Sequence, residues 1–229
     1  MEAHHRRWLI AAAAAVVLVI AAFVLFGGPG DPADDLANGA GEVRIEAIHR
    51  LSERNDAQSA QVLSRYVRDQ DTQVATQSLL ALSRMKSQGD SGSLAQALRD
   101  NRPEVREAAI VALAPRDPGA VRQVLTDPRE KDQVRATAVA ELGAQQNWES
   151  MPDMIKAMND PSEEVRKAAY NSVLTILGVR RYAGYDPEGD DPKSKQERAA
   201  FVSYLLTNYG NMKDSVDDWK KRVKMKRGG

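Results

Sequence analysis

The segment that decides the fold of this chain is DNRPEVREAAIVAL, residues 100–113, in which Val105, Ala109 and Leu113 are spaced four positions apart. In a helix of 3.6 residues per turn, these positions fall on one narrow stripe. The small alanine lets a neighbouring helix approach closely, and the valine and leucine fill the space on either side. Because so narrow a stripe is not stable alone, the segment predicts a helix that is covered by further helices of the same kind.

The same pattern, Val-x-x-x-(Ala/Ser)-x-x-x-(Leu/Val), occurs at five places along the chain. It begins at Val43, Val74, Val105, Val134 and Val165, so successive copies are separated by 31, 31, 29 and 31 residues. Self-similarity at such a period is typical of a stacked array of helix pairs. Arrays of this kind present a long continuous surface, and they usually bind other molecules rather than catalyse reactions.

Shorter apolar stretches between the copies predict the first helix of each pair. They lie at 61–63, 94–98, 120–125 and 151–158, and each is followed by an aspartate, namely Asp69, Asp100, Asp127 and Asp160. The third of these aspartates lies seven residues before its valine and the other three lie five before, so the third turn is predicted to be two residues longer. The first copy, Glu42 to Leu51, has no recognisable partner helix before it and is predicted to cap the N-terminal end.

Two turn segments, DNRPEVREAA (100–109) and DPSEEVRKAA (160–169), resemble the short HEAT-like repeat of bilin lyases and many bacterial proteins. The resemblance extends over residues 42–178, although Ala75 stands where the other copies have arginine. It implies an all-α solenoid of about four and a half repeats, with the second helices along the inner curve. It also implies a structural ladder between the arginine after each valine and the aspartates of the turns. The candidates are Arg44, Arg106, Arg135 and Arg166 with Asp69, Asp100, Asp127 and Asp160.

An apolar segment precedes the repeats. Trp8 to Phe26 is an unbroken apolar run of 19 residues, which as a helix would be roughly 28 Å long and close to the thickness of a bilayer core. Arg6 and Arg7 precede the run and acidic residues follow it, which predicts a cytoplasmic N-terminus with the repeats on the extracytoplasmic, periplasmic side. We therefore expect a single-pass signal-anchor helix, with a cleaved signal peptide as the alternative. The absence of cysteine excludes a lipid anchor and disulfides.

These features divide the chain into five regions: a cytoplasmic tail (1–7), a transmembrane helix (8–26), a flexible linker (27–41), the repeat array (42–178) and a C-terminal region (179–229). The last region predicts a turn-rich loop and two capping helices, at 194–208 and 213–224, that cover the end of the array. Its basic end favours a solvated helix terminus over a site for nucleic acid or anionic lipid. Lys+Arg and Asp+Glu both number 32, so net charge gives no global attraction to either class of partner.

The motifs of known catalytic and metal sites are either missing or incomplete. Gly89-Asp90-Ser91-Gly92 spells a serine-protease nucleophile motif, but the one histidine outside the N-terminal tail, His49, lies on a helix of the first copy and no β signals occur. One histidine is too few for a di-iron site, and the acidic loop from Asp186 to Asp191 lacks calcium-loop spacing. Met151, Met154 and Met158 share one helix face and indicate core packing. We expect no catalytic residue, metal or cofactor.

The side of the second helices that faces away from the core is the remaining candidate for function. Positions six residues after each valine include Leu80, Val111 and Ala140, and positions two after it include Thr76 and Glu107. On the inner curve these residues would form a mildly apolar strip, which is typical of a partner-binding surface. The alternative is that tight curvature buries the strip.

The sequence therefore predicts a membrane-anchored HEAT-like scaffold or adaptor that binds a protein or peptide and is not an enzyme. One alternative is an accessory to an enzyme, which holds a prosthetic group or its acceptor as bilin-lyase-like proteins do. Another is a purely architectural envelope protein. The identity of the partner does not follow from the sequence.

Overall fold

The computed structural model of the chain describes residues 30–85, 91–181 and 184–227. Within these ranges all regular elements are helices, which confirms the expected all-α class. They are α2 (Pro32–Asn38), α3 (Glu42–Arg54), α4 (Ala57–Ser64), α5 (Thr72–Arg84), α6 (Ser91–Ala97), α7 (Pro103–Leu113), α8 (Pro118–Thr126), α9 (Asp132–Ala144), the short 3-10 helix η1 (Trp148–Ser150), α10 (Met151–Ala157), α11 (Glu163–Leu177) and α12 (Pro192–Arg227).

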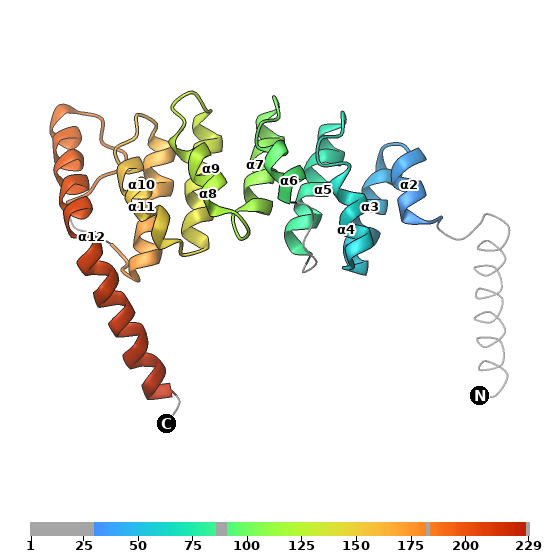
Figure 1. Cartoon of the computed structure of the whole chain (residues 1–229). Coiled ribbons are helices and arrows are strands. Elements are labelled where there is room, and N and C mark those ends of the chain that lie inside the picture. Colours follow the sequence, from blue (N-terminus) through green and yellow to red (C-terminus); the bar gives the residue numbers. More distant parts are fainter. Residues whose placement is uncertain (1–29, 86–90, 182–183, 228–229) are drawn as a thin grey trace, which may run out of the picture.

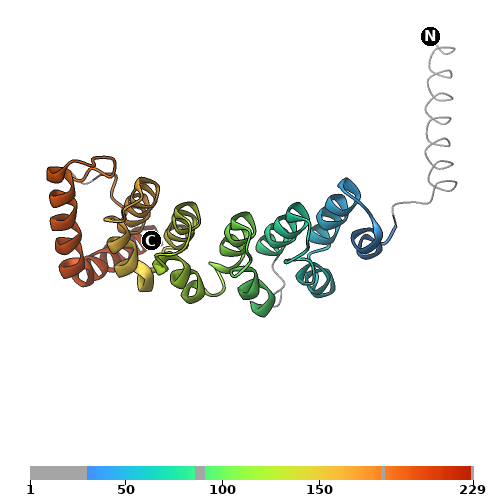
Figure 2. The ribbon, with the colours of Figure 1, turned by 90° about the horizontal axis from the view of Figure 1, so that it is seen from above.

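The helices stack side by side into one elongated array (Figure 1). The second helix of each pair, α3, α5, α7, α9 and α11, packs against the next second helix in chain order. Figure 2 shows that these second helices line the concave side of a curved row, while α4, α6, α8 and α10 lie on the convex side. The predicted solenoid and the expected placement of the second helices on the inner curve agree with this arrangement.

The core lies between the two layers and is built from the repeated stripe. Val74, Val105, Val134 and Val165 are almost completely buried, as are the central small residues Ala47, Ser78, Ala109, Ala138 and Ala169. Val43 is the exception, with 51% of its surface exposed. It opens the first copy, where no earlier second helix is present in the described residues to cover that side. The register predicted from the stripe is otherwise confirmed.

Two second helices, α9 and α11, approach each other closely. A Cβ atom built on Gly143 of α9 would lie 2.9 Å from the Cα of Ser172 on α11. The Ser172 hydroxyl donates a hydrogen bond of 3.0 Å to the Val139 carbonyl across the same contact. Glycine is therefore required here to let the two backbones meet.

The N-terminal end differs from the prediction. Residues 27–41 were expected to be a flexible linker, yet α2 lies within them and packs against α3, with Leu36 fully buried. Asp31 caps this helix by accepting a 3.0 Å hydrogen bond from the Ala33 amide, and proline occupies its first position. The first copy therefore has a partner helix, and the described residues form five helix pairs rather than four and a half.

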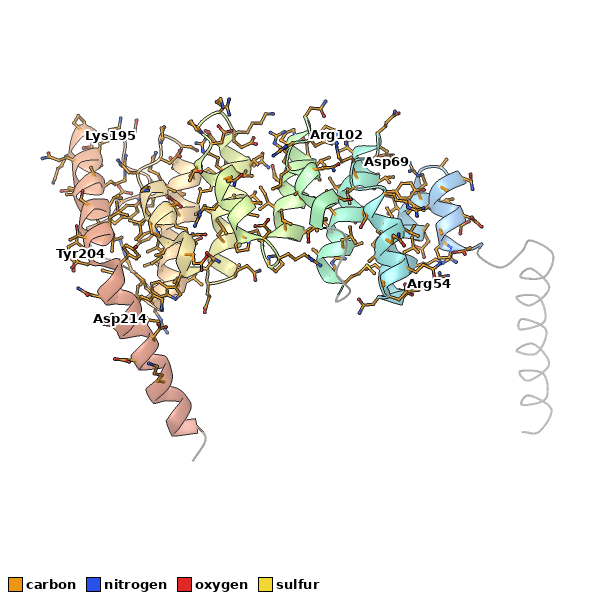
Figure 3. The ribbon with its side chains drawn as sticks, viewed as in Figure 1. Arg54, Asp69, Arg102, Lys195, Tyr204 and Asp214 are labelled. Atoms are coloured by element: carbon orange, nitrogen blue, oxygen red, sulfur yellow. The ribbon has the colours of Figure 1, made fainter. Side chains whose placement is uncertain are left out.

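The C-terminal end also differs. The two expected helices are one continuous helix, α12, of 36 residues. Gly210 lies inside it and contributes no helix break, because a glycine without a neighbouring proline costs a helix only about 1 kcal/mol. The helix axis changes direction between Tyr204 and Asp214 in Figure 3. Val202 and Leu205, in the first half of α12, are buried in contact with the last repeat, so the expected role as a cap is present.

Among the helices of the described ranges, none is both long enough and apolar enough to span a membrane. The predicted anchor, Trp8 to Phe26, and the tail before it lie outside the described residues.

Candidate functional site

The inter-helix turns lie along one edge of the array, where Asp69 and Arg102 are both visible in Figure 3. Each of the four predicted ladder aspartates closes its own turn by accepting a hydrogen bond from the amide two residues later. The acceptor–donor pairs are Asp69–Asp71 (2.9 Å), Asp100–Arg102 (3.0 Å), Asp127–Arg129 (2.9 Å) and Asp160–Ser162 (2.8 Å). This turn chemistry is typical of aspartate and explains the residue type at these positions.

Two of the predicted arginine–aspartate pairs are present. Arg44 donates to both carboxylate oxygens of Asp69, at 3.1 and 2.6 Å, and Arg135 donates to Asp160 at 2.8 Å. In both cases the arginine reaches forward to the turn of the next helix pair. The hydrogen bonds from Arg44 hold the pKa of the Asp69 carboxyl below its ordinary value.

The other two arginines have different partners. Arg106 donates to Glu130 at 2.8 and 2.6 Å rather than to Asp127, because the longer turn brings Glu130 into the place of the aspartate. Asp127 instead accepts from Arg129 in its own turn. Arg166 donates to the Pro187 carbonyl at 2.7 Å, since the loop after α11 lies where the turn of a next helix pair would be.

The departure at Ala75 is compensated by a residue that the sequence reasoning did not single out. Asp100, which has no arginine at position 75 to contact it, accepts two hydrogen bonds of 2.9 Å from Arg102. Arg102 also donates to the Gln70 carbonyl at 3.0 Å, so it links its own turn to the preceding one. In the sequence, the absence of an arginine at position 75 was the one sign that another residue had to contact Asp100. The ladder is a structural device that fixes the spacing of the turns.

The loop after α11 repeats the turn chemistry of the ladder aspartates. Asp186 accepts a hydrogen bond of 2.9 Å from the Glu188 amide, as the ladder aspartates do. Tyr185 is buried, stacks on Tyr170 with ring centroids 4.7 Å apart, and donates its hydroxyl to the Met158 carbonyl at 2.5 Å. Burial raises the pKa of Tyr185. The acidic loop is therefore a fifth turn that joins the array to α12.

The predicted strip lies on three successive second helices of the concave side. Leu80 on α5 and Val111 on α7 are half-buried, and Ala140 on α9 is exposed. Thr76 and Glu107 are also half-buried, and the Thr76 hydroxyl donates to its own helix at the Thr72 carbonyl, 2.9 Å away. The two larger apolar side chains are thus neither fully covered nor fully solvated.

Glu107 connects the strip to its neighbours. Its carboxylate accepts a hydrogen bond of 3.3 Å from the Gln133 amide on α9. Burial raises the pKa of Glu107, and the negative charges of Glu104 on α7 and Glu164 on α11 raise it further. Glu107 therefore lies in a locally negative environment to which both α7 and α11 contribute.

The sequence matches the profile of HEAT repeats over residues 35–114 and 120–183. The chain belongs to the HEAT-repeat family. The match begins at Asp35, inside α2, and so agrees with the additional N-terminal helix. Stacked repeats of this class bury a continuous core and present an extended concave surface that commonly binds other proteins.

Solved structures similar to this HEAT-repeat chain include two engineered proteins. One is 17% identical, with a TM-score of 0.44, over 85% of this chain and 95% of the other. The second is also 17% identical, with a TM-score of 0.45, over 83% of this chain and 63% of the other. The comparison with curated proteins finds no match.

The remaining sequence candidates occupy ordinary structural positions. Ser91 begins α6, while Gly89 and Asp90 lie outside the described residues. His49 is exposed on α3, and the three methionines 151, 154 and 158 are buried in the core. In the described parts of the chain, no group of three or more histidine or carboxylate side chains is placed to hold a metal ion.

Proposed function

We propose that this HEAT-repeat protein is a non-enzymatic scaffold that binds a protein or peptide on its concave face, at the strip of Leu80, Val111 and Ala140. The observation that carries the proposal is the partial exposure of Leu80 and Val111 on adjacent second helices. Exposed apolar side chains that gather on one surface are typical of interaction sites. The ladder supports the same role, because it holds the second helices at fixed spacing and so keeps the surface preorganised.

We also propose that the scaffold is anchored in a membrane. The apolar run Trp8 to Phe26 would anchor the chain, with the cytoplasm on the side of Arg6 and Arg7 and the repeats on the extracytoplasmic side. Its support is the length of the run and the charges on either side of it.

Val111→Lys tests the surface. A partner that covers Val111 would have to desolvate the new ammonium group, whereas a free surface would tolerate it. We expect the variant to fold. We also expect that it no longer cross-links to the proteins that the parent chain captures in native membranes. Gln123→Lys, at an exposed position of α8 on the convex side, is the matched control and should retain them. A folded Val111→Lys variant that captures the same proteins as the parent would contradict the proposal.

One measurement, the absorbance of visible light by the purified protein, distinguishes the scaffold from the alternative role as holder of a prosthetic group. A protein purified from its native membrane with a bound chromophore would absorb visible light, and the absorbance would follow the protein through gel filtration. A colourless protein whose capture of partners depends on Val111 favours the scaffold.

A further inference from the structure

The concave side of the second helices carries acidic side chains that have no basic partner. Six glutamates of these helices are exposed or, in the case of Glu107, half-buried: Glu42, Glu46, Glu53, Glu104, Glu107 and Glu164. The glutamates that form ion pairs within the described parts of the chain are four others, at positions 130, 163, 188 and 197. The acidic residues of the concave side are therefore available to an external cation.

The basic residues of the same helices are occupied. The arginines after the valines are bound in the turns, and Arg50 and Arg54 pair with Asp35 and Asp31. Lys167 pairs with both Glu163 and Glu188. Within the described residues of these helices, Arg84 in the last turn of α5 is the exception. A chain with equal numbers of acidic and basic residues thus presents a concave side of negative charge.

Acidic residues lie beside the apolar strip. Glu107 and Glu104 lie one and two helical turns before Val111 on α7, so the three side chains share one stripe of that helix. Glu164 lies two second helices further along, on α11. A cation placed beside Val111 would face the Glu107 carboxylate, and it would relieve part of the repulsion that Glu107 experiences from Glu104 and Glu164.

We propose that the concave face binds a cationic peptide segment, in which lysine or arginine side chains flank an apolar residue that contacts Leu80 and Val111. The inference rests on the proposed function for the place of binding, and it adds the charge of the partner. A negatively charged partner is disfavoured, because the unpaired glutamates would repel it and no free row of basic residues lies among them. The long acidic surface would also accelerate the encounter with a cationic partner at low ionic strength.

Two substitutions of Val111 with opposite charges test whether the partner is cationic. Val111→Lys and Val111→Glu place side chains of comparable size at the same half-buried site, so they differ mainly in charge. The probe is a fluorescein-labelled synthetic peptide of lysine and leucine, titrated against the full-length chain in detergent micelles. We expect Val111→Lys to bind it about tenfold more weakly than Val111→Glu, since the first repels the peptide and the second adds an attractive charge.

A second variant removes charge without touching the strip. Glu104→Gln, Glu107→Gln and Glu164→Gln together should weaken binding of the peptide about tenfold, because three attractive charges are lost. Its control removes three exposed carboxylates elsewhere, by Glu149→Gln, Glu197→Gln and Asp218→Asn, and should bind as the parent does. Far-UV circular dichroism and thermal melting establish that each variant is folded.

The results separate this inference from the proposed function. Equal binding of the peptide by the two Val111 variants, or unchanged binding by the triple glutamine variant, would overturn the cationic partner. The scaffold proposal would survive that result if native partners still depend on Val111. Conversely, the proposed function is contradicted if the folded Val111→Lys variant still captures the native partner proteins. A peptide of glutamate and leucine that binds as tightly as the lysine peptide also overturns the inference.

Discussion

Arg102 donates two hydrogen bonds of 2.9 Å to the carboxylate of Asp100, two residues earlier in the same turn, and so compensates for the arginine that is missing at position 75. Asp127 and Arg129 have the same spacing and the same pairing in the next turn. The two pairs differ in burial, however: side-chain exposure is 23% and 6% for Arg102 and Asp100, and 88% and 38% for Arg129 and Asp127.

This difference predicts unequal effects of the same substitution. Arg102→Ala should lower the free energy of unfolding by about 1–3 kcal/mol, because the nearly buried Asp100 carboxylate loses charged hydrogen-bond donors. Arg129→Ala should change it by less than about 0.5 kcal/mol, since the pair is solvated. Urea denaturation of the two variants beside the parent measures both values. Equal losses would mean that burial does not decide the strength of these turns.

The carboxyls of Asp69 and Asp100 should make the array sensitive to acid. Arginine hydrogen bonds lower both pKa values in the folded state. Their stabilising effect is therefore fully present above the unfolded pKa of about 3.9 and is lost as the pH falls through the folded value. Asp100→Asn should destabilise the protein at neutral pH and much less at about pH 3. Melting temperatures at the two pH values test this, and a gap that persists in acid would contradict it.

Glu107 should show the opposite pH dependence. Its pKa is raised in the folded state, so its stabilising effect is present below the unfolded pKa and is lost as the pH rises through the folded value. Glu107→Gln should therefore raise the melting temperature at neutral pH and leave it nearly unchanged in acid. A fall in the neutral-pH melting temperature would show that the hydrogen bond from Gln133 outweighs burial and repulsion.

Two glycines inside helices should respond in opposite directions to alanine. At Gly143 the new methyl group would meet the α11 backbone at Ser172, so Gly143→Ala should cost about 1–3 kcal/mol. At Gly210 a Cβ atom meets nothing within 4 Å, so Gly210→Ala should stabilise α12 by about 0.5–1 kcal/mol. Thermal melts of the two variants decide the matter. Stabilisation by Gly143→Ala would show that α9 and α11 are not in close contact.

The predicted stripe is tested at its centre. Leu113 is fully buried, and Leu113→Ala should cost about 2–5 kcal/mol. Ala109→Leu should cost about 1–3 kcal/mol, because the neighbouring second helices leave no room for a larger side chain. Helical circular dichroism followed against temperature measures both changes. Parent-like melting of both variants would mean that the register of the stripe is wrong.

The repeat, its register and the all-α class were predictable from the sequence alone. These follow from spacings of four residues within one helix and of about 31 along the chain, and both are local properties of the sequence. It also identified Leu80, Val111 and Ala140 as positions opposite the buried stripe. The nature of the partner could not be predicted in this way, because the charge of the concave side depends on which acidic residues remain unpaired.

The pairing of each arginine with its acid, and the two ends of the array, became clear from the packed structure. Arg106 contacts Glu130 because a two-residue insertion displaces Asp127, and Arg102 contacts Asp100 because Ala75 cannot. Residues 32–38 form α2, although their region is rich in glycine, proline and aspartate, because Leu36 gains a buried site against α3. For Arg106 and for α2, contacts between segments distant in sequence decide the outcome, and no local pattern encodes such contacts.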